Sequence, residues 1–361
     1  MKTLLLLAAT LLLVALSVLC HMTVPSAGLN FMAACLAIIP LAGWMGRTTE
    51  EITVKVGPRL GGLLSATFGN AVEIIIGCFA LSQGLTTLVK ASITGSILGN
   101  LLFVLGLSFL VGGLKHPVQR FNIRVAHSQT AMLMLGIPIM FLLPVIFSAS
   151  RYHSLLVMTG AVCSVSFLVY ILGLVFSLYT HRQLLGDLEE ERNEDIEDPG
   201  RIKNSNLLFV NLPVSLLILL IVTVLVAVES DFLVHSVEHL ASHAGWSQMF
   251  LGVIVVAIIG NAAEHASAVW MAWKNRMDLS LEIAVGSSLQ VAMFVAPVLY
   301  FFSIIVGHPM FFQFSVPELV SLTAAILLVA ILMVDGESNW LEGAMAVGAY
   351  AVMAIGFYIL H

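Results

Sequence analysis

The chain has 361 residues, of which 59% are hydrophobic and only 10% are charged. A soluble domain devotes about a quarter of its residues to charge, so this composition excludes an ordinary soluble protein. The net charge of −6 identifies no partner, and no nucleic-acid partner is expected. The four cysteines have no paired spacing and lie in apolar segments, so neither a disulfide framework nor a metal-thiolate site is expected.

Apolar blocks of roughly 20 residues, the length that a helix needs to cross the hydrocarbon core of a bilayer, follow one another along the chain. We therefore predict an all-α polytopic membrane protein with eleven transmembrane helices. The helices are expected near residues 2–21, 27–46, 59–82, 87–113, 127–147, 154–180, 206–234, 249–273, 280–306, 316–334 and 340–360.

The first block resembles a signal peptide, because Lys2 precedes an apolar run that ends at Cys20. Val18 and Leu19 occupy the positions where a lipoprotein cleavage site requires small residues, and no small-x-small pattern follows the run. We therefore interpret residues 1–24 as transmembrane helix 1.

The basic residues orient these helices. With eleven spans, thirteen of the 15 Lys and Arg residues fall on one side of the membrane, and only Lys90 and Arg151 fall on the other. Basic residues are retained in the cytoplasm. We therefore expect a cytoplasmic N-terminus, an extracytoplasmic C-terminus and a location in the plasma or inner membrane.

A five-residue motif occurs twice. Gly-Asn-Ala-Val-Glu at residues 69–73 is repeated as Gly-Asn-Ala-Ala-Glu at residues 260–264, with an offset of 191 residues. At the same offset, Leu60-Gly61 matches Leu251-Gly252 and Gly95-Ser96 matches Gly286-Ser287. The match extends over two consecutive helices, so the chain is predicted to contain an internal repeat.

The predicted repeat unit has five helices, helices 2–6 against helices 7–11, with helix 1 outside it. An odd number of helices makes the second copy enter the membrane from the opposite face, which is the inverted architecture of secondary transporters. The predicted boundaries are residues 1–24 for helix 1, 25–182 for the first repeat, 183–204 for a linker and 205–361 for the second repeat. The linker is rich in acids and is expected to be cytoplasmic. It is either a solvated tether or a cation-attracting regulatory element.

Glu73 and Glu264 are expected near the middles of helices 3 and 8. An acidic residue at mid-helix costs about 2.5–3.5 kcal/mol to insert, so such residues face the bundle interior and usually serve function. Two carboxylates in an apolar pocket repel each other, and either protons or one divalent cation would neutralise them. This competition predicts cation–proton exchange.

Neutral oxygen donors accompany each glutamate. Asn70 and Asn261 lie three residues before Glu73 and Glu264, on the same helical face. Further hydroxyl and amide oxygens come from Ser96, Asn100, Ser287 and Gln290. A donor set without sulfur suits Ca²⁺, with Mn²⁺ as the alternative. Each neutral donor is equally compatible with an interhelical packing bond.

Several other titratable residues are weaker candidates. His265, adjacent to Glu264, either relays protons or is a packed neutral side chain. The acids Glu229, Glu282 and Glu318 are candidates for vestibule or relay roles. At the end of helix 7, one stripe is formed by Asp231, His235, His239 and His243. This stripe either senses extracytoplasmic pH or is a solvated helix end.

The paired motifs resemble those of the cation/proton exchanger family within the Ca²⁺/cation antiporter superfamily. Similar family patterns occur at residues 57–64, 278–283, 285–290 and 339–343. The resemblance implies a prokaryotic-type Ca²⁺/H⁺ antiporter with an acidic cytoplasmic helix between its halves and the motif glutamates as its cation site. Sodium/calcium exchangers of the superfamily carry hydroxyl residues where Asn70 and Asn261 stand, which favours protons as the counter-ion.

We therefore expect a secondary active transporter that exchanges Ca²⁺ for H⁺ by alternating access, without a cofactor or enzymatic activity. Its expected partners are Ca²⁺, H⁺ and the lipid bilayer. Both a monomer and a homo-oligomer are compatible with the sequence. The first alternative is a Na⁺/Ca²⁺-type exchanger on the same fold. A cation channel is a less favoured alternative. An intramembrane hydrolase is disfavoured because the chain has no His-Glu-x-x-His arrangement.

Overall fold

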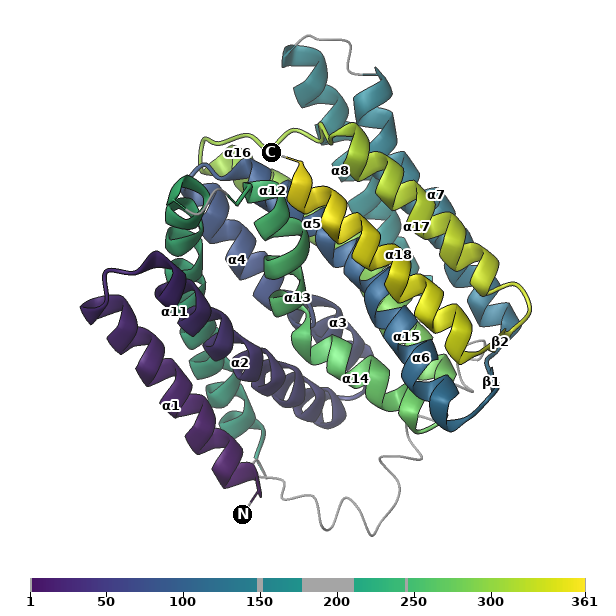
Figure 1. Ribbon diagram of the computed structural model, residues 1–361, viewed down its shortest axis with the longest axis horizontal. Coiled ribbons are helices and arrows are strands. Elements are labelled where there is room, and N and C mark those ends of the chain that lie inside the picture. Colours follow the sequence, from purple (N-terminus) through teal and green to yellow (C-terminus); the bar gives the residue numbers. More distant parts are fainter. Residues whose placement is uncertain (1, 148–151, 177–210, 244–245, 361) are drawn as a thin grey trace. The chain divides into compact units, whose positions relative to one another are not determined.

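The structure is a computed structural model that describes residues 2–147, 152–176, 211–243 and 246–360 (Figure 1). The chain divides into two compact units, residues Met1–Ile76 with Gly173–Ala244, and residues Gly77–Leu172 with Gly245–His361. Each unit takes segments from both predicted repeats, so the compact units and the sequential repeats are different divisions of the chain. The predicted linker, residues 183–204, lies outside the described residues.

Unit 1 is built around two long helices that run antiparallel. It contains α1 (Lys2–Thr23), α2 (Ala27–Val56), α3 (Pro58–Phe68), the first part of α4 (Ala71–Ser82) and α11 (Leu212–His243). At one end of the α2–α11 pair, Lys55 Nζ donates to Ser215 Oγ (2.8 Å). At the other end, Gly28 approaches Leu240. Helix α1 is attached to α2 by a hydrogen bond from Trp44 Nε1 to Thr10 Oγ1 (3.0 Å).

Two interrupted helical spans supply much of the buried interior of unit 2. One consists of α5 (Thr86–Leu98), the π-helical segment η1 (Gly99–Val104) and α6 (Leu105–Lys115). The other consists of α15 (Met277–Gln290), η5 (Val291–Val295) and α16 (Ala296–Ile305). In their most apolar windows, 72% and 50% of the residues are buried. The spans begin 191 residues apart, which is the offset of the sequence motifs.

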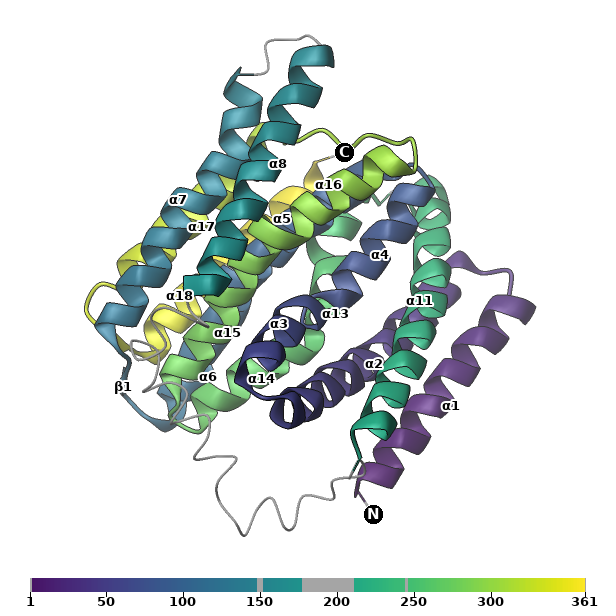
Figure 2. The same cartoon turned by 180° about the vertical axis from the view of Figure 1, so that it is seen from behind.

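The other helices of unit 2 surround these spans. They are α7 (Ile123–Phe147), α8 (Tyr152–Val175), α12 (Gln248–Phe250), η4 (Leu251–Val256), α13 (Ala257–Gly260), α14 (Ala262–Trp273), α17 (Val316–Leu332) and α18 (Trp340–Ile359). In both ribbon views α18 lies along α6 (Figures 1 and 2). A Cβ on Gly343 would collide with the backbone of Leu110 and Gly106, so small residues set this close approach.

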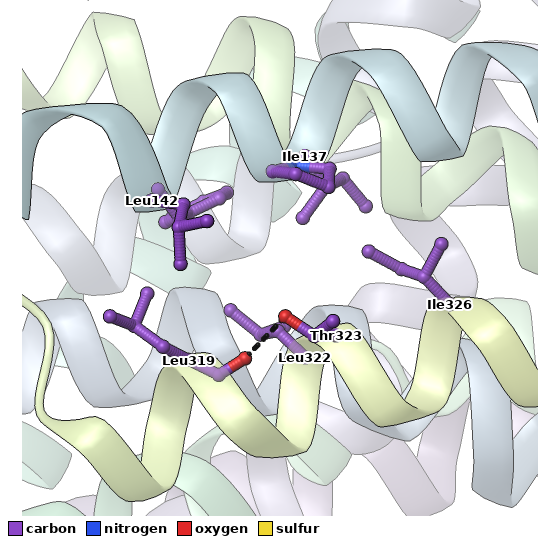
Figure 3. A pocket seen from close by; sticks show the side chains of 8 residues that line it. Ile137, Leu142, Leu319, Leu322, Thr323 and Ile326 are labelled. Carbon is purple, nitrogen blue, oxygen red and sulfur yellow. Dashed lines mark hydrogen bonds between the residues drawn. The ribbon is translucent and has the colours of Figure 1, made fainter. Parts of the chain in front are cut away.

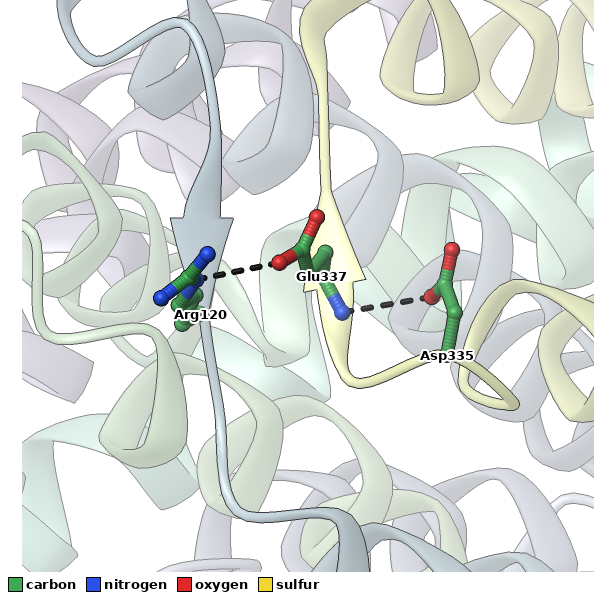
Figure 4. A network of polar contacts seen from close by, with 3 residues as sticks. All are labelled: Arg120, Asp335 and Glu337. Carbon is green, nitrogen blue, oxygen red and sulfur yellow. Dashed lines mark hydrogen bonds and ion pairs between the residues drawn. The ribbon is translucent and has the colours of Figure 1, made fainter.

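Two connectors of unit 2 are joined by a short antiparallel strand pair. Strand β1 (Gln119–Arg120) pairs with β2 (Glu337–Ser338). Across the pair, Arg120 Nε donates to Glu337 Oε1 (3.0 Å; Figure 4). Within the second connector, the Glu337 backbone N–H donates to Asp335 Oδ1 (3.2 Å). The ion pair is exposed, so it contributes about 0–1 kcal/mol at most.

A small crevice lies between α7 and α17, lined by residues such as Ile137, Leu142, Leu319 and Ile326 (Figure 3). Its volume is about 10 Å³. The hydroxyl of Thr323 is already bonded within its own helix, to Leu319 O (2.8 Å). A buried water needs two to four polar partners. The crevice is therefore an apolar packing gap and offers no binding chemistry.

The exposed surface of the helices is strongly apolar. Within the described residues, eight helices are long and apolar enough to cross a membrane, and the bent segment from Gln248 to Trp273 is a ninth candidate. Helices α4 and α17 are shorter apolar helices. The protein is therefore an all-α, multi-pass membrane protein, as predicted. The count of eleven spans stays a prediction, although each of the eleven predicted segments contains helix.

Candidate cation site

Both sequence motifs lie at interruptions between helices. In the first half, α3 ends at Phe68 and α4 begins at Ala71, with Gly69 and Asn70 between them. In the second half, α13 ends at Gly260 and α14 begins at Ala262, and the chain bends by 62° at the break. We predicted continuous helices over 59–82 and 249–273, so this detail of the prediction was wrong.

The residues of the second motif account for the break at Asn261. Its backbone angles (φ −98°, ψ 5°) leave the helical region. Its side-chain Nδ2 donates to Ala257 O (2.9 Å), one turn earlier. Glycine and asparagine are weak helix formers, and asparagine competes for backbone groups through its own amide.

Glu73 and Glu264 consequently lie in the first turn of α4 and α14 and not near the middle of a helix. The N-terminal turn of a helix has unpaired N–H groups and a partial positive charge, which favours an anionic side chain. Discontinuous helices of this kind are typical of substrate sites in secondary transporters.

Unit 2 contains two sets of buried hydrogen bonds between its helical spans. Asn261 Nδ2 donates to Ser96 Oγ of α5 (2.9 Å). Asn100 Nδ2 of η1 donates to Ser287 Oγ of α15 (3.1 Å). His265 Nε2 lies 3.1 Å from Asn100 Oδ1, and Ser287 is hydrogen-bonded to the Glu264 carboxylate. The second set thus connects Glu264 with His265 through Ser287 and Asn100.

Two oxygen atoms of residues in these sets are available to a cation. Glu264 Oε2 and Asn261 Oδ1 are inaccessible to solvent and have no hydrogen-bond partner in the part of the chain that the structure describes. A buried acceptor without a partner is unfavourable, by about 1–3 kcal/mol. A carboxylate and an amide oxygen are ligands that Ca²⁺ prefers. Within the described residues, no group of three or more His, Cys, Asp or Glu side chains could hold a metal ion.

The structure brings together six of the nine residues predicted for the site, all in unit 2: Ser96, Asn100, Asn261, Glu264, His265 and Ser287. Gln290 is the last residue of α15 and directly precedes η5. Asn70 is fully buried and, with Glu73, belongs to unit 1. At the helix interruption in the first half of the chain, Asn70 and Glu73 occupy the positions that Asn261 and Glu264 occupy in the second half.

The weaker candidates differ in their surroundings. Glu318 is buried, but its carboxylate accepts from Thr94 Oγ1 (3.3 Å) and from the Ser315 backbone N–H (2.7 Å), so it caps α17. Glu282 lies on the exposed face of α15. Glu229 is fully buried in unit 1 and accepts a hydrogen bond from Ser17 of α1. Ser17 was not predicted, although a polar residue in an apolar run signals a buried partner.

The interrupted apolar helices, with a buried carboxylate and neutral oxygens at the break, define a membrane carrier for a small cation. The comparison with known families narrows this class. Residues 26–179 and 214–359 match the family described as "Sodium/calcium exchanger protein". The chain belongs to this family.

Several related proteins align with nearly the whole chain. A Ca(2+)/H(+) antiporter, ChaA, of Bacillus subtilis (strain 168) is 47% identical over 340 residues, 93% of each chain. A Ca(2+)/H(+) antiporter of Aphanothece halophytica is 45% identical over 91% of this chain and 89% of its own. The solved structure of native YfkE is 44% identical, with a TM-score of 0.83 over 99% of both chains. The H+/Ca2+ exchanger CAX, at 13% identity and a TM-score of 0.73, shares the fold.

Proposed function

We propose that this protein is a secondary active transporter that exchanges Ca²⁺ for H⁺ across the membrane by alternating access. The observation that carries the proposal is the repeated helix interruption that places a glutamate in the first turn of the following helix, Glu73 in α4 and Glu264 in α14. The names of the relatives as Ca(2+)/H(+) antiporters support the choice of ions.

The chemistry of exchange follows from the competition for oxygen atoms. A carboxylate in an apolar interior is unfavourable unless it is paired, coordinated or protonated. Ca²⁺ and protons therefore exclude each other from the same carboxylates, and release of one permits binding of the other. In this scheme Glu73 and Glu264 bind Ca²⁺ and protons in turn.

We assign the other predicted residues to supporting roles. Asn70, Asn261, Ser96, Asn100, Ser287 and Gln290 supply or position neutral oxygens for the cation. His265, which is bonded to Asn100 and so linked to Glu264, is assigned to proton transfer. The absence of sulfur from this set favours Ca²⁺, with Mn²⁺ as a second ion of suitable chemistry.

The proposal also places the chain in the plasma or inner membrane with a cytoplasmic N-terminus. The asymmetry of the basic residues in the sequence supports this orientation. Labelling of single cysteines introduced near Lys2 and near the C-terminus, with an impermeant reagent on intact cells, tests it.

The deciding experiment measures uptake of radiolabelled Ca²⁺ in proteoliposomes under separately imposed pH and Na⁺ gradients. The proposal expects uptake driven by the pH gradient and unaffected by the Na⁺ gradient. Uptake driven by Na⁺ alone would establish the sodium-coupled alternative, and steady current without counter-ion flux would establish a channel. Mn²⁺ added as a competitor measures the ion preference.

A further inference from the structure

Glu229, near the middle of α11, is a buried acidic residue that the candidate cation site does not use. Its side chain has no solvent exposure. Ser17 Oγ of α1 donates to its Oε2 (2.6 Å). Its other oxygen, Oε1, is buried and has no hydrogen-bond partner among the described residues. A single hydrogen bond to a carboxyl group therefore joins α1 to α11 at this depth.

Among the described residues, no basic side chain compensates the charge of this carboxyl group. Within the described residues it takes part in no ion pair. Helix α2 runs antiparallel to α11 and has no charged residue between Ala27 and Gly46, Cys35 being its one titratable group there. Lys55 lies beside Ser215, fourteen residues from Glu229 and so roughly 21 Å along the helix axis. Asp231 lies about 200° around α11 from Glu229.

A pocket of about 540 Å³ lies at the end of the same helices, lined by residues of α1, α2 and α11 that include His21, Asn30, His235 and His239. In both ribbon views these three helices lie side by side (Figures 1 and 2). The rings of His235 and His239 meet edge to face, with centroids 5.3 Å apart. His21 lies 6.2 Å from His235 and stacks on Phe232, at 4.0 Å. The pocket therefore gathers three imidazoles from two helices.

The pocket lies at one end of the α1–α11 contact and Glu229 lies nearer its middle, and α1 carries a polar group at each place. Ser17 and His21 are four residues apart and share a face of α1. On α11, Glu229 is six residues, or roughly 9 Å of helix, from His235. His21 Nδ1 is buried and has no hydrogen-bond partner in the described residues. One face of α1 thus places Ser17 at the Glu229 carboxyl group and His21, one turn later, in the pocket.

We propose that Glu229 is a second proton-binding site, loaded from the pocket of His21, His235 and His239, and that it regulates exchange by controlling the contact between α1 and α11. A protonated imidazole in the pocket gives up its proton, and the carboxylate of Glu229 becomes a neutral carboxyl group. The ionised form accepts a hydrogen bond from Ser17, whereas the protonated form can also donate one. The ligand is the proton, because Glu229 is a single carboxyl group with one hydroxyl neighbour, too few oxygen ligands for a hard metal ion.

The first test measures proton binding directly and does not depend on transport. Infrared difference spectra of the protein in lipid membranes are recorded as pH is stepped from acid to alkaline. The proposal expects a carboxyl C=O band that disappears with rising pH in the wild type and is missing in Glu229→Gln. The matched control, Glu337→Gln, alters an exposed acid and should retain that band. Identical difference spectra for the wild type and Glu229→Gln would overturn the proposal.

A second variant guards against misfolding of Glu229→Gln. Ser17→Ala keeps the carboxyl group and removes a hydrogen bond that favours its ionised form, so the midpoint of the band should move to higher pH. An unmoved midpoint would contradict the predicted contact.

The regulatory part rests on the proposed function and is read from Ca²⁺ flux. Replacing His21, His235 and His239 together with glutamine should shift the pH at half-maximal rate, measured on the pocket side, by roughly one unit. An unshifted profile would overturn the role of the pocket. If no variant, nor the wild type, shows flux driven by a pH gradient, the proposed function fails, while the spectroscopic test of Glu229 still stands.

Discussion

The carboxylate of Glu264 has one oxygen at the Ser287 hydroxyl and one buried oxygen without a partner among the described residues. Replacing Glu264 by glutamine removes both the charge that binds a divalent cation and the group that takes up a proton. We expect Glu264→Gln and Glu73→Gln each to abolish Ca²⁺ exchange while the protein remains folded. Flux in proteoliposomes, with size-exclusion chromatography as the folding control, measures this. Normal pH-driven flux in either variant would contradict the assignment.

The two neighbouring serines Ser287 and Ser288 offer a matched test of the second set of buried hydrogen bonds. Ser287 is bonded to Asn100 and to Glu264. Ser288 is equally buried but donates to Ala284 O of its own helix (3.0 Å). Loss of one ligand or orienting bond worth about 1–3 kcal/mol should raise the apparent Ca²⁺ constant of Ser287→Ala by roughly one to two orders of magnitude. Ser288→Ala should leave it unchanged, and equal effects would reduce Ser287 to a packing residue.

Gln290 is predicted from sequence to coordinate the cation through its amide oxygen. Gln290→Ala should therefore raise the apparent Ca²⁺ constant by a similar factor, because a comparable ligand is lost. Titration of Ca²⁺-dependent flux measures the constant. A value equal to that of the wild type would make Gln290 a packing residue beside η5.

At the scale of elements, the crossing of α5 with η4 depends on a glycine. A Cβ on Gly95 would collide with the backbone carbonyl of Val253, which cannot rotate away as a side chain can. A Cβ on Gly99, one turn later, would meet nothing within 4 Å. Gly95→Ala should reduce the free energy of unfolding by the cost of overpacking, about 1–3 kcal/mol, and so lower the thermal unfolding temperature. Gly99→Ala should be neutral, and equal melting temperatures would show that the crossing tolerates a methyl group.

The helices themselves could be predicted from apolar blocks, whereas their interruptions could not. The block at 87–113 appears as the span Thr86–Lys115, and the block at 280–306 as Met277–Ile305. The π-helical segments η1 and η5 were not predicted. A π-helix changes the hydrogen-bonding pattern from i+4 to i+5, and this change leaves no mark on the hydropathy of the sequence. They nevertheless occupy nearly equivalent places, Gly99–Val104 and Val291–Val295, at the 191-residue offset. The repeat therefore extends from the motifs to these two π-helical segments, whereas η4 (Leu251–Val256) corresponds to residues 60–65 of the α-helix α3.

The residues of the buried polar sets could be predicted from the sequence, but the hydrogen bonds between them could not. Ser96, Asn100, Asn261 and Ser287 stood out because amide and hydroxyl groups are rare in apolar helices. Their partners come from the opposite half of the chain, as in the bond from Asn261 to Ser96. Pairing at such sequence separation is set by helix packing, which local patterns do not encode.

At the scale of the whole molecule, the acidic run between Asp187 and Asp198 is the largest hydrophilic feature of the sequence. Clustered carboxylates raise the local concentration of cations, and salt screens this effect. Neutralising these acids should leave Glu73 and Glu264 functional but change the rate or the Ca²⁺ dependence of flux at low ionic strength. Flux measured at low and high salt checks this. Unchanged rate, affinity and salt dependence would identify the run as a tether.

The strand pair between β1 and β2 bears on the order in which the molecule is assembled. Arg120 and Glu337 are 217 residues apart in sequence. A ribosome delivers the chain from the N-terminus, so β1 emerges long before its partner exists. A contact of such separation forms late, because the entropy of closing a long loop must first be offset by other interactions. The β1–β2 pair therefore cannot form until the chain beyond α17 has been synthesised, so the two connectors are joined only late in assembly.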